Sequence, residues 1–357
     1  MRRQTDQPAP ARANRRCRWM SLCAIGLCLA GCAKPAGVIF PPLDKPLAWP
    51  GGSEPDRIRY VGQLVTSVDL KPAVPFGQGL VDALFGKKDI NSMLTPYALC
   101  TDGAQRLFVA DTNAQFVHVF DLERRTYEQW RPPKETPFSQ PVGIAYDPAG
   151  RLFVADSIAA CVFVFDASGK PMGHIGSGLL SRPCGIAYDP SNSRLLVADT
   201  AAHQLIALSA TGQLLARIGQ RGTELGEFNY PTNVAVDTQG RIYVSDSLNF
   251  RVQQLSPDLK PLRQIGRKGD MPGYFSHPKG LALDSQDHLY VVDANFEAVQ
   301  IFNSSGTLLM DFGEEGQGPG EFWLPAGIFI DRLDRIWIAD SYNRRVQVFD
   351  YVPENKP

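Results

Sequence analysis

The chain has 357 residues, of which 44% are hydrophobic and 20% are charged. A chain of this size and composition can bury a large core, and it is neither disordered nor of low complexity. The formal net charge is -1, but residues 1–32 carry six Arg and one Asp, or +5, which leaves -6 for the rest. A mildly acidic body argues against nucleic acid as a partner.

Residues 1–32 have the layout of an export signal. Basic residues precede an apolar run from Trp19 to Ala30, which is too short for a permanent membrane-spanning helix. The run ends in Leu-Ala-Gly-Cys at Cys32, which resembles a bacterial lipobox, where the Cys thiol carries the diacylglycerol. An uncleaved anchor with a chance Cys is the alternative. We expect lipidation of Cys32 and a lipid-anchored protein of the bacterial cell envelope.

The residues after Cys32 indicate where the protein is sorted and how it is held. Ala33 stands where an Asp would resemble an inner-membrane retention signal, so the periplasmic side of the outer membrane is favoured in a Gram-negative organism. Residues 33–56 contain six Pro and little apolar periodicity. This composition predicts a semi-rigid linker, extended in part as polyproline II, that holds the body off the membrane.

Three cysteines remain after the leader: Cys100, Cys161 and Cys184. An odd and sparse set in an exported protein does not form a disulfide framework. Cys100 occupies a position that holds Ala in other repeats, which predicts a small core residue. A bridge between Cys161 and Cys184 is left open as a weaker hypothesis.

One phrase occurs six times along the body: a Pro, an apolar run to Asp, a turn, a second apolar run to Asp, and a third apolar run. The second Asp of each copy recurs at intervals of 45, 43, 47, 47 and 47 residues, at Asp111, Asp156, Asp199, Asp246, Asp293 and Asp340. Periods of this length indicate a propeller or a solenoid. The runs are short, β-branched and aromatic, which excludes helical repeats. Their consecutive apolar positions indicate strands that are covered on both faces.

The last copies carry the clearest family signature. DSLNFRVQQL and DSYNRRVQVF, together with the preceding GQRGTELGEFNYP and GEEGQGPGEFWLP, resemble NHL repeats over residues 57 to 351. The WD and GH signature of WD40 blades is missing from the sequence. The resemblance implies an all-β fold, a six-bladed β-propeller, over residues 57–357.

The count of strands predicts how the ring closes. A polar fourth strand follows most copies, and Thr126–Trp130 is expected to be that of the first blade, whereas the last copy stops at Tyr351. Residues 57–62, RIRYVG, have the ending of a fourth strand without a blade of their own, so we expect them to complete the sixth blade and remove an exposed edge. We call the face where each first strand begins the top. By this geometry the linker leaves from the bottom.

A long insertion, residues 63–95, separates this closing strand from the first blade and is expected on the top face. Phe76, Leu80 and Leu84 recur at helical spacing, which predicts a short helix over 78–86. The helix is either a lid or docking element over the channel mouth, or a support packed on the blade rims.

Two sets of top-facing positions are candidates for binding a partner. The residue after the Pro varies between copies while its neighbours repeat, at Tyr97, Val142, Cys184, Thr232, Lys279 and Ala326. The turns between the second and third strands carry apolar residues where polar ones suit exposed turns, including Ile158, Leu248, Phe250, Phe296 and Tyr342. The alternative for this second set is that it covers Phe228, Phe275 and Phe322 of the adjoining loops.

The chemistry-bearing residues do not form a recognisable catalytic set. Some six-bladed relatives of the repeat, the peptidyl-amidoglycolate lyases, hold zinc with several His in the channel, but only His203 and His277 of the five His are expected to face the top. The repeated Asp residues suit turn caps. No GxSxG or phosphate loop is present. We therefore expect no catalytic residue, metal or cofactor, although a calcium-dependent lactonase site is compatible with the spacing.

These observations predict a monomeric, non-catalytic scaffold at the cell envelope that binds a protein or peptide through its top face. The alternative is a metal-dependent lyase or lactonase with its site in the central channel.

Overall fold

The computed structural model describes residues 34–52, 54–86, 89–103 and 105–353. It divides into two compact units. The smaller comprises Met1–Gly37 and Pro72–Asp89, and the larger comprises Val38–Lys71 and Ile90–Pro357. Cys32 lies outside the described residues. Among the described residues, no helix is both long enough and apolar enough to cross a membrane.

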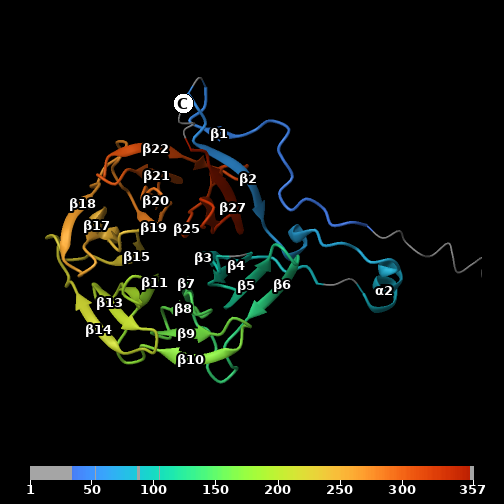
Figure 1. Cartoon of the computed structure of the whole chain (residues 1–357), viewed down its shortest axis with the longest axis horizontal. Coiled ribbons are helices and arrows are strands. Elements are labelled where there is room, and N and C mark those ends of the chain that lie inside the picture. The colour runs from blue at the N-terminus through green and yellow to red at the C-terminus, as the bar shows by residue number, and fades with distance from the viewer. Residues whose placement is uncertain (1–33, 53, 87–88, 104, 354–357) are drawn as a thin grey trace, which may run out of the picture. The chain divides into compact units, whose positions relative to one another are not determined.

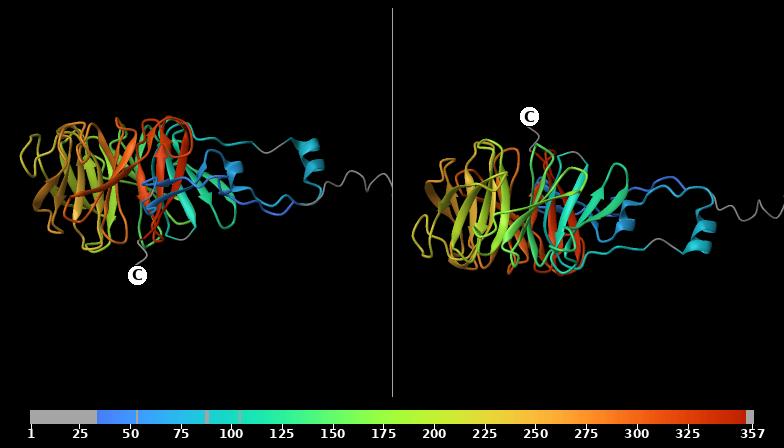
Figure 2. Two further views of the ribbon diagram at one scale, coloured as in Figure 1. Left: turned by 90° about the horizontal axis from the view of Figure 1, so that it is seen from above. Right: turned by 90° about the horizontal axis from the view of Figure 1, so that it is seen from below.

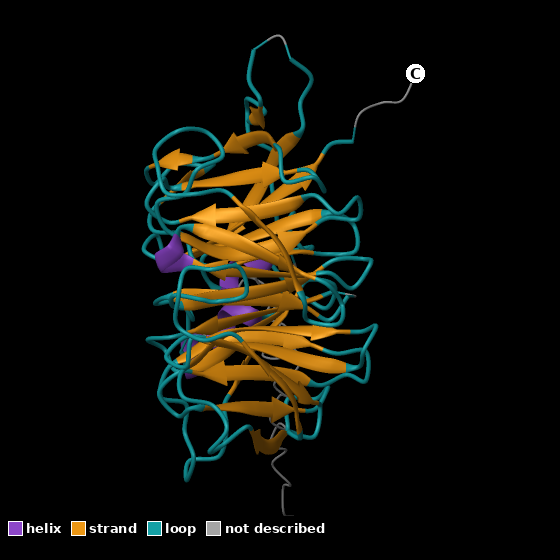
Figure 3. Cartoon of the chain, turned by 90° about the vertical axis from the view of Figure 1, so that its left-hand side faces the viewer, coloured by secondary structure: helices purple, strands orange, loops and turns teal. Residues whose placement is uncertain are grey.

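The larger unit is a ring of six antiparallel blades (Figure 1), and its strands run between two loop-bearing faces when the ring is seen edge-on (Figures 2 and 3). The first blade has β3 (Pro96–Thr101), β4 (Arg106–Asp111), β5 (Phe116–Asp121) and β6 (Thr126–Trp130). The second has β7 (Pro141–Tyr146), β8 (Leu152–Asp156), β9 (Cys161–Phe165) and β10 (Pro171–Ile175). The third has β11 (Pro183–Asp189), β12 (Arg194–Asp199), β13 (Gln204–Ser209) and β14 (Leu214–Ile218).

The fourth blade has β15 (Pro231–Val236), β16 (Ile242–Asp246), β17 (Arg251–Leu255) and β18 (Pro261–Ile265). The fifth has β19 (Pro278–Leu283), β20 (Leu289–Asp293), β21 (Ala298–Phe302) and β22 (Leu308–Phe312). The sixth has β25 (Ile328–Ile330), β26 (Arg335–Asp340), β27 (Arg345–Tyr351), β2 (Ile58–Leu64) and β1 (Ala48–Trp49). The remaining elements are the 3-10 helices η1 (Ser67–Leu70) and η2 (Ser247–Asn249), the helix α2 (Gln78–Phe85), and a short parallel pair, β23 (Glu314–Glu315) and β24 (Glu321–Phe322).

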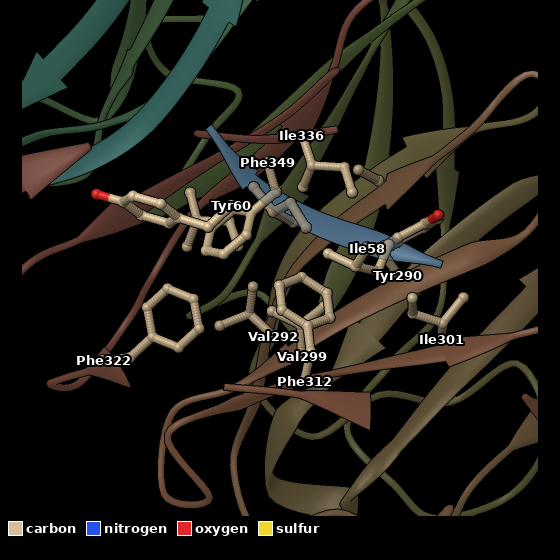
Figure 4. Packing of buried hydrophobic residues seen from close by; sticks show 13 residues of the cluster. Ile58, Tyr60, Tyr290, Val292, Val299, Ile301, Phe312, Phe322, Ile336 and Phe349 are labelled. Carbon is tan, nitrogen blue, oxygen red and sulfur yellow. The ribbon is translucent and has the colours of Figure 1, made fainter. Parts of the chain in front are cut away.

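The core consists of six clusters, one between each pair of neighbouring blades. Each inner strand therefore buries both faces, which explains why its apolar residues are consecutive. Figure 4 shows the cluster between the fifth and sixth blades, where the rings of Phe312 and Phe349 lie 5.1 Å apart. Each fully buried ring contributes about 1.5–3 kcal/mol of transfer free energy.

The repeated Asp residues cap the loops, as the sequence predicted. Asp293 is fully buried and accepts the backbone N–H groups of Ser276 and His277 at 2.7 and 2.9 Å, and Asp156 and Asp199 accept the corresponding N–H groups in their blades. Each carboxylate thus fixes the loop that leads into the first strand of its own blade.

Glycine two residues after the Pro lets neighbouring blades approach at the centre of the ring. A Cβ at Gly143 would collide with the carbonyl oxygen of Cys184, and one at Gly327 with that of Tyr97. Hydroxyl groups also join blades here, since Thr112 donates to the carbonyl of Pro141 at 2.9 Å. The mouth is therefore built from closely packed backbone.

The ring closes as predicted. Strand β2 pairs antiparallel with β27 from Ile58 opposite Tyr351 to Leu64 opposite Val346. Figure 1 shows the blue N-terminal strand beside the red C-terminal one. Arg345 also donates to the side chain of Gln63 at 2.9 Å.

The structure corrects the interpretation of residues 33–56 as a free linker that leaves from the bottom. Strand β1 pairs with β2, and Trp49 packs between the rings of Phe312 and Phe349 at 5.7 and 5.9 Å. Farther back, Phe40 lies against Gly62 and is 6.3 Å from the ring of Trp337. The chain thus descends along the outer edge of the sixth blade before it turns into β2, and it enters the propeller at that edge.

The ends of the insertion also differ from expectation. Instead of covering the mouth, they run along the outer strand of the first blade: Arg125 donates to the carbonyl of Leu70 at 2.9 Å, and Gln129 to the side chain of Asn91. Leu70 and Met93 are buried in the cluster between the sixth and first blades. The predicted helix is present as α2 and belongs to the smaller unit.

One bottom turn differs from the others in a way that gives a pH-dependent prediction. His288 occupies the position that holds Arg in the other five repeats, and its Nδ1 lies 2.8 Å from Asp284. The hydrogen bond to Asp284 raises the pKa of His288. A raised folded-state pKa stabilises the protein fully below the unfolded pKa, and this stabilisation is lost as pH rises through the folded value.

We therefore expect His288→Arg to match the wild type in free energy of unfolding at pH 5.5 and to exceed it at pH 8.5, because Arg keeps its charge. Urea unfolding of both proteins at the two pH values measures this difference. The other titratable groups are the same in both proteins, so their pH effects cancel in the comparison. A difference in unfolding free energy that does not change with pH would contradict the stabilising role of protonated His288.

Candidate functional site

The top mouth brings together three of the six variable positions. Tyr97 comes from the first blade, Cys184 from the third and Lys279 from the fifth. The Lys279 ammonium lies 5.9 Å from the centre of the Tyr97 ring, a distance at which a cation is attracted to an aromatic face. Burial, with a smaller contribution from Cys184, raises the pKa of Tyr97 to about 12. Tyr97 is therefore a neutral phenol beside groups from two other blades.

The other three variable positions contribute less surface. Val142 and Ala326 are only 7% and 3% exposed, so the structure does not support them as binding residues. They are buried because the glycine that follows each of them admits the backbone of a neighbouring blade. Thr232 is half-buried, and its hydroxyl is 2.5 Å from that of Ser247.

Lys279 has an acidic neighbour that sequence reasoning missed. Burial lowers the pKa of Lys279, while Glu297 and Asp293 oppose this effect. Burial raises the pKa of Glu297, whose carboxylate accepts the backbone N–H of Leu324 at 2.6 Å. Glu297 has a positive φ of 53°, as does His203 at 56°, and His203 likewise accepts a backbone N–H from the next loop, that of Tyr230. Both residues stand four positions after the repeated Asp, and this position was the sequence signal that could have identified Glu297.

The apolar turn residues divide between the two predicted roles. Phe250 packs on the cluster that contains Phe275 and has Lys268 4.9 Å from its ring, and Phe296 is half-buried. Ile158 and Tyr342 are 67% and 57% exposed. The rings of the adjoining loops, Phe228, Phe275 and Phe322, each lie against a glycine, at Gly219, Gly266 and Gly313.

Tyr342 forms part of an exposed aromatic pair on the sixth blade. Its ring centre lies 5.6 Å from that of Trp323, which is 42% exposed, and the backbone N–H of Tyr342 donates to the carbonyl of Trp323 at 3.2 Å. Leu248 is also exposed on the fourth blade. Large aromatic side chains held this way are typical anchors of protein interfaces.

The central channel behind the mouth encloses a cavity of about 240 Å³. It is lined by the innermost segments of all six blades, from Ala98–Thr101 on the first to Gly327–Ile330 on the sixth. None of the described lining residues carries a carboxylate, an imidazole or an amine. The channel wall therefore offers backbone, apolar side chains and a few neutral polar groups.

A larger cavity, of about 640 Å³, lies at the bottom of the fifth and sixth blades. Pro50, Pro55 and Arg57 form one side, and His288 and Met310 lie on the other. Sequence reasoning missed it because the linker was not expected to pack here.

Metal and disulfide chemistry find little support in the part of the chain that the structure describes. No three His, Cys, Asp or Glu side chains converge there in a metal-binding arrangement. Cys161 and Cys184 are free, so the hypothesis of a bridge between them is wrong, and Cys100 is buried, as predicted. Burial raises the pKa of Cys161 to about 11, which keeps this thiol protonated.

Solved structures with this fold have diverse descriptions. A virginiamycin B lyase from Staphylococcus aureus aligns with a TM-score of 0.55 at 14% identity, covering 72% of this chain and 96% of that one. An auxiliary nutrient binding protein from Bacteroides thetaiotaomicron aligns with a TM-score of 0.58 at 14% identity, covering 74% and 70%. A similar protein from Bacteroides ovatus gives 0.58 at 12% identity, covering 73% and 70%. At these identities the likeness shows the fold alone.

Family models match the same architecture. A model described as a 6-bladed beta-propeller matches residues 276–353, and the NHL repeat model matches residues 138–165 and 228–255. A search of curated proteins gave no match to this sequence. The structure has six blades, the 6-bladed beta-propeller model matches the last two and the NHL repeat model matches parts of the second and fourth, so the protein is a six-bladed β-propeller that contains NHL repeats.

Proposed function

We propose that the protein is a lipoprotein of the bacterial envelope, anchored through Cys32, whose propeller binds a protein or peptide partner through its top face. The observation that carries this proposal is the exposed aromatic pair Trp323 and Tyr342, held on a rigid blade on the same face as the mouth. Aromatic anchors on a preformed surface lose little conformational entropy on binding.

The mouth supplies polar recognition beside this apolar patch. Lys279 and Glu297 offer a donor and an acceptor that are partly desolvated, so a hydrogen bond from a partner would be stronger there than in open water. The pairing suits a peptide backbone, which presents both a carbonyl and an N–H group.

Site-specific cross-linking tests the proposal in cells that make the protein naturally. The photoreactive residue p-benzoylphenylalanine is placed at position 342 on the top, or at position 168 in an exposed bottom turn as a control. We expect a discrete cross-linked product from position 342 only. The same cross-linked products from both positions, or no cross-linked product from position 342, would contradict the proposal.

Removing the anchors should weaken that complex. Trp323→Ala and Tyr342→Ala are each expected to cost on the order of 2 kcal/mol of binding free energy, or roughly 30-fold in affinity for the cross-linked partner. Leu333→Ala, a change at an exposed bottom residue, serves as the control and should leave affinity unchanged. Isothermal titration with the purified partner measures these values.

The alternative is a metal-dependent lyase or lactonase in the central channel, and the fold shared with a virginiamycin B lyase keeps this candidate open. A ligand set would have to come from beyond the described channel lining. Elemental analysis of the purified protein that finds stoichiometric calcium, zinc or iron would favour this alternative over a scaffold.

A further inference from the structure

The smaller unit exposes an apolar helix beside the residues that follow Cys32. Phe76, Leu84 and Phe85 are 70%, 68% and 84% exposed, an unusual density of bare large side chains within ten residues. Val81, which is 47% exposed, and Leu84 and Phe85 stand at i, i+3 and i+4 of α2, so they share one side of the helix.

Gln78 and Asp82 form a polar strip that borders Phe85, and Asp82 lies two residues before Leu84, across the helix from it. Gln78 donates to the carboxylate of Asp82 at 2.7 Å, across one turn of the helix. The helix is therefore amphipathic, with its apolar side unpartnered in the described chain. Lys87 and Lys88 follow it in the sequence, and Lys34 pairs with Val74, four residues before its start. This combination is typical of a helix that lies in a membrane interface.

Backbone pairing holds this region close to the position of the lipid. The N–H of Lys34 donates to the carbonyl of Val74 at 3.0 Å, and the N–H of Val74 donates back to Lys34 at 2.9 Å. Lys34 is two residues from Cys32, and two residues span at most about 7 Å. An acylated Cys32 would thus keep Val74, and the helix that begins four residues later, at the bilayer surface.

We propose that α2 is an interfacial helix that inserts Leu84 and Phe85, together with Phe76 just before it, into the membrane beside the lipid anchor. This inference rests on the proposed lipidation of Cys32. Helix and lipid then act as two attachments on either side of the bridge between Lys34 and Val74, so the membrane contact involves more than the lipid alone.

The test uses the mature lipidated protein, which begins at Cys32, in vesicles of phosphatidylethanolamine and phosphatidylglycerol. A Cys184→Ser background removes the half-buried thiol, while Cys100 and Cys161 are buried and remain unlabelled. Leu84→Cys, across the helix from Asp82, is labelled with the fluorophore NBD. Asp82→Cys on the polar side of the helix and Ser168→Cys on the propeller are the matched controls.

We expect blue-shifted emission from position 84 and roughly threefold stronger quenching by spin-labelled lipids than at positions 82 and 168. Equal quenching at all three positions would overturn the proposal. A blue shift at position 84 without quenching by lipid would also overturn it, because the helix would then contact protein.

Mass spectrometry of the same preparation separates this inference from the anchoring proposal. Acylated Cys32 with a solvent-exposed position 84 refutes the interfacial helix alone. An unacylated Cys32 refutes the anchor and, with it, the inference.

Discussion

Deleting residues 38–64 is expected to prevent the propeller from closing, and Ile58→Ala alone is expected to lower its free energy of unfolding by about 2–5 kcal/mol. Ile58 is fully buried between the fifth and sixth blades, in the cluster with Tyr290 and Phe349 (Figure 4). Without β2, the backbone of β27 would present an unpaired edge and two apolar clusters would open to water.

The neighbouring residue on the same strand provides the control. Arg59 points away from the core and forms an exposed pair with Asp56 at 3.6 Å, which is worth about 0–1 kcal/mol. Urea unfolding followed by tryptophan fluorescence compares Ile58→Ala with Arg59→Ala. Gel filtration of the deletion variant should show aggregated or expanded protein. Similar losses for both point variants would contradict the assigned role of β2.

The closure of the ring was predictable because the repeat imposes a strict count. Five copies were expected to have a fourth strand and the sixth none. RIRYVG at residues 57–62 was therefore assigned as the fourth strand of the sixth blade. The pairing of β2 with β27 joins residues almost 300 positions apart, but the periodicity fixed both partners in advance.

The path of the linker lacked such a constraint. Strand β1 is two residues long, too short to show any period, and its contacts with Phe312 and Phe349 are set by the shape of the finished ring. Phe40 and Trp49 could have indicated that this segment packs against the propeller, because large aromatic side chains are usually buried and are uncommon in a solvated spacer.

The sequence predicted which positions lie at the mouth, but it did not predict which of their side chains are exposed. Register placed Tyr97, Cys184 and Lys279 at the mouth, and the structure brings them together. Burial of Val142 and Ala326 depends on how closely neighbouring backbones approach, which follows from packing in three dimensions. Glu297 was missed because its role appears only when the next loop folds over it.

The buried ion pair of Asp340 and Arg345 gives the second large effect. Asp340 is fully buried and accepts from Arg345 at 2.7 Å, from Asn343 at 2.9 Å and from Gln347 at 3.1 Å, as well as from the backbone N–H of Trp323. Arg345 is 5% exposed. Asp340→Ala would leave this guanidinium without its counter-ion in the core, which is expected to cost about 3–5 kcal/mol.

A double variant distinguishes the lost pair from a lost loop cap. If the unpaired guanidinium of Arg345 causes most of the loss of stability, Asp340→Leu combined with Arg345→Met should be less destabilising than Asp340→Ala, because no unpaired charge remains. Asp311→Ala, at an exposed position of β22, should stay within about 0.5 kcal/mol of the wild type. Urea unfolding measures all three. A double variant that is destabilised at least as much as Asp340→Ala would show that the carboxylate acts mainly as a cap for the backbone of Trp323, and that the charge of Arg345 is already satisfied by the carbonyl groups around it.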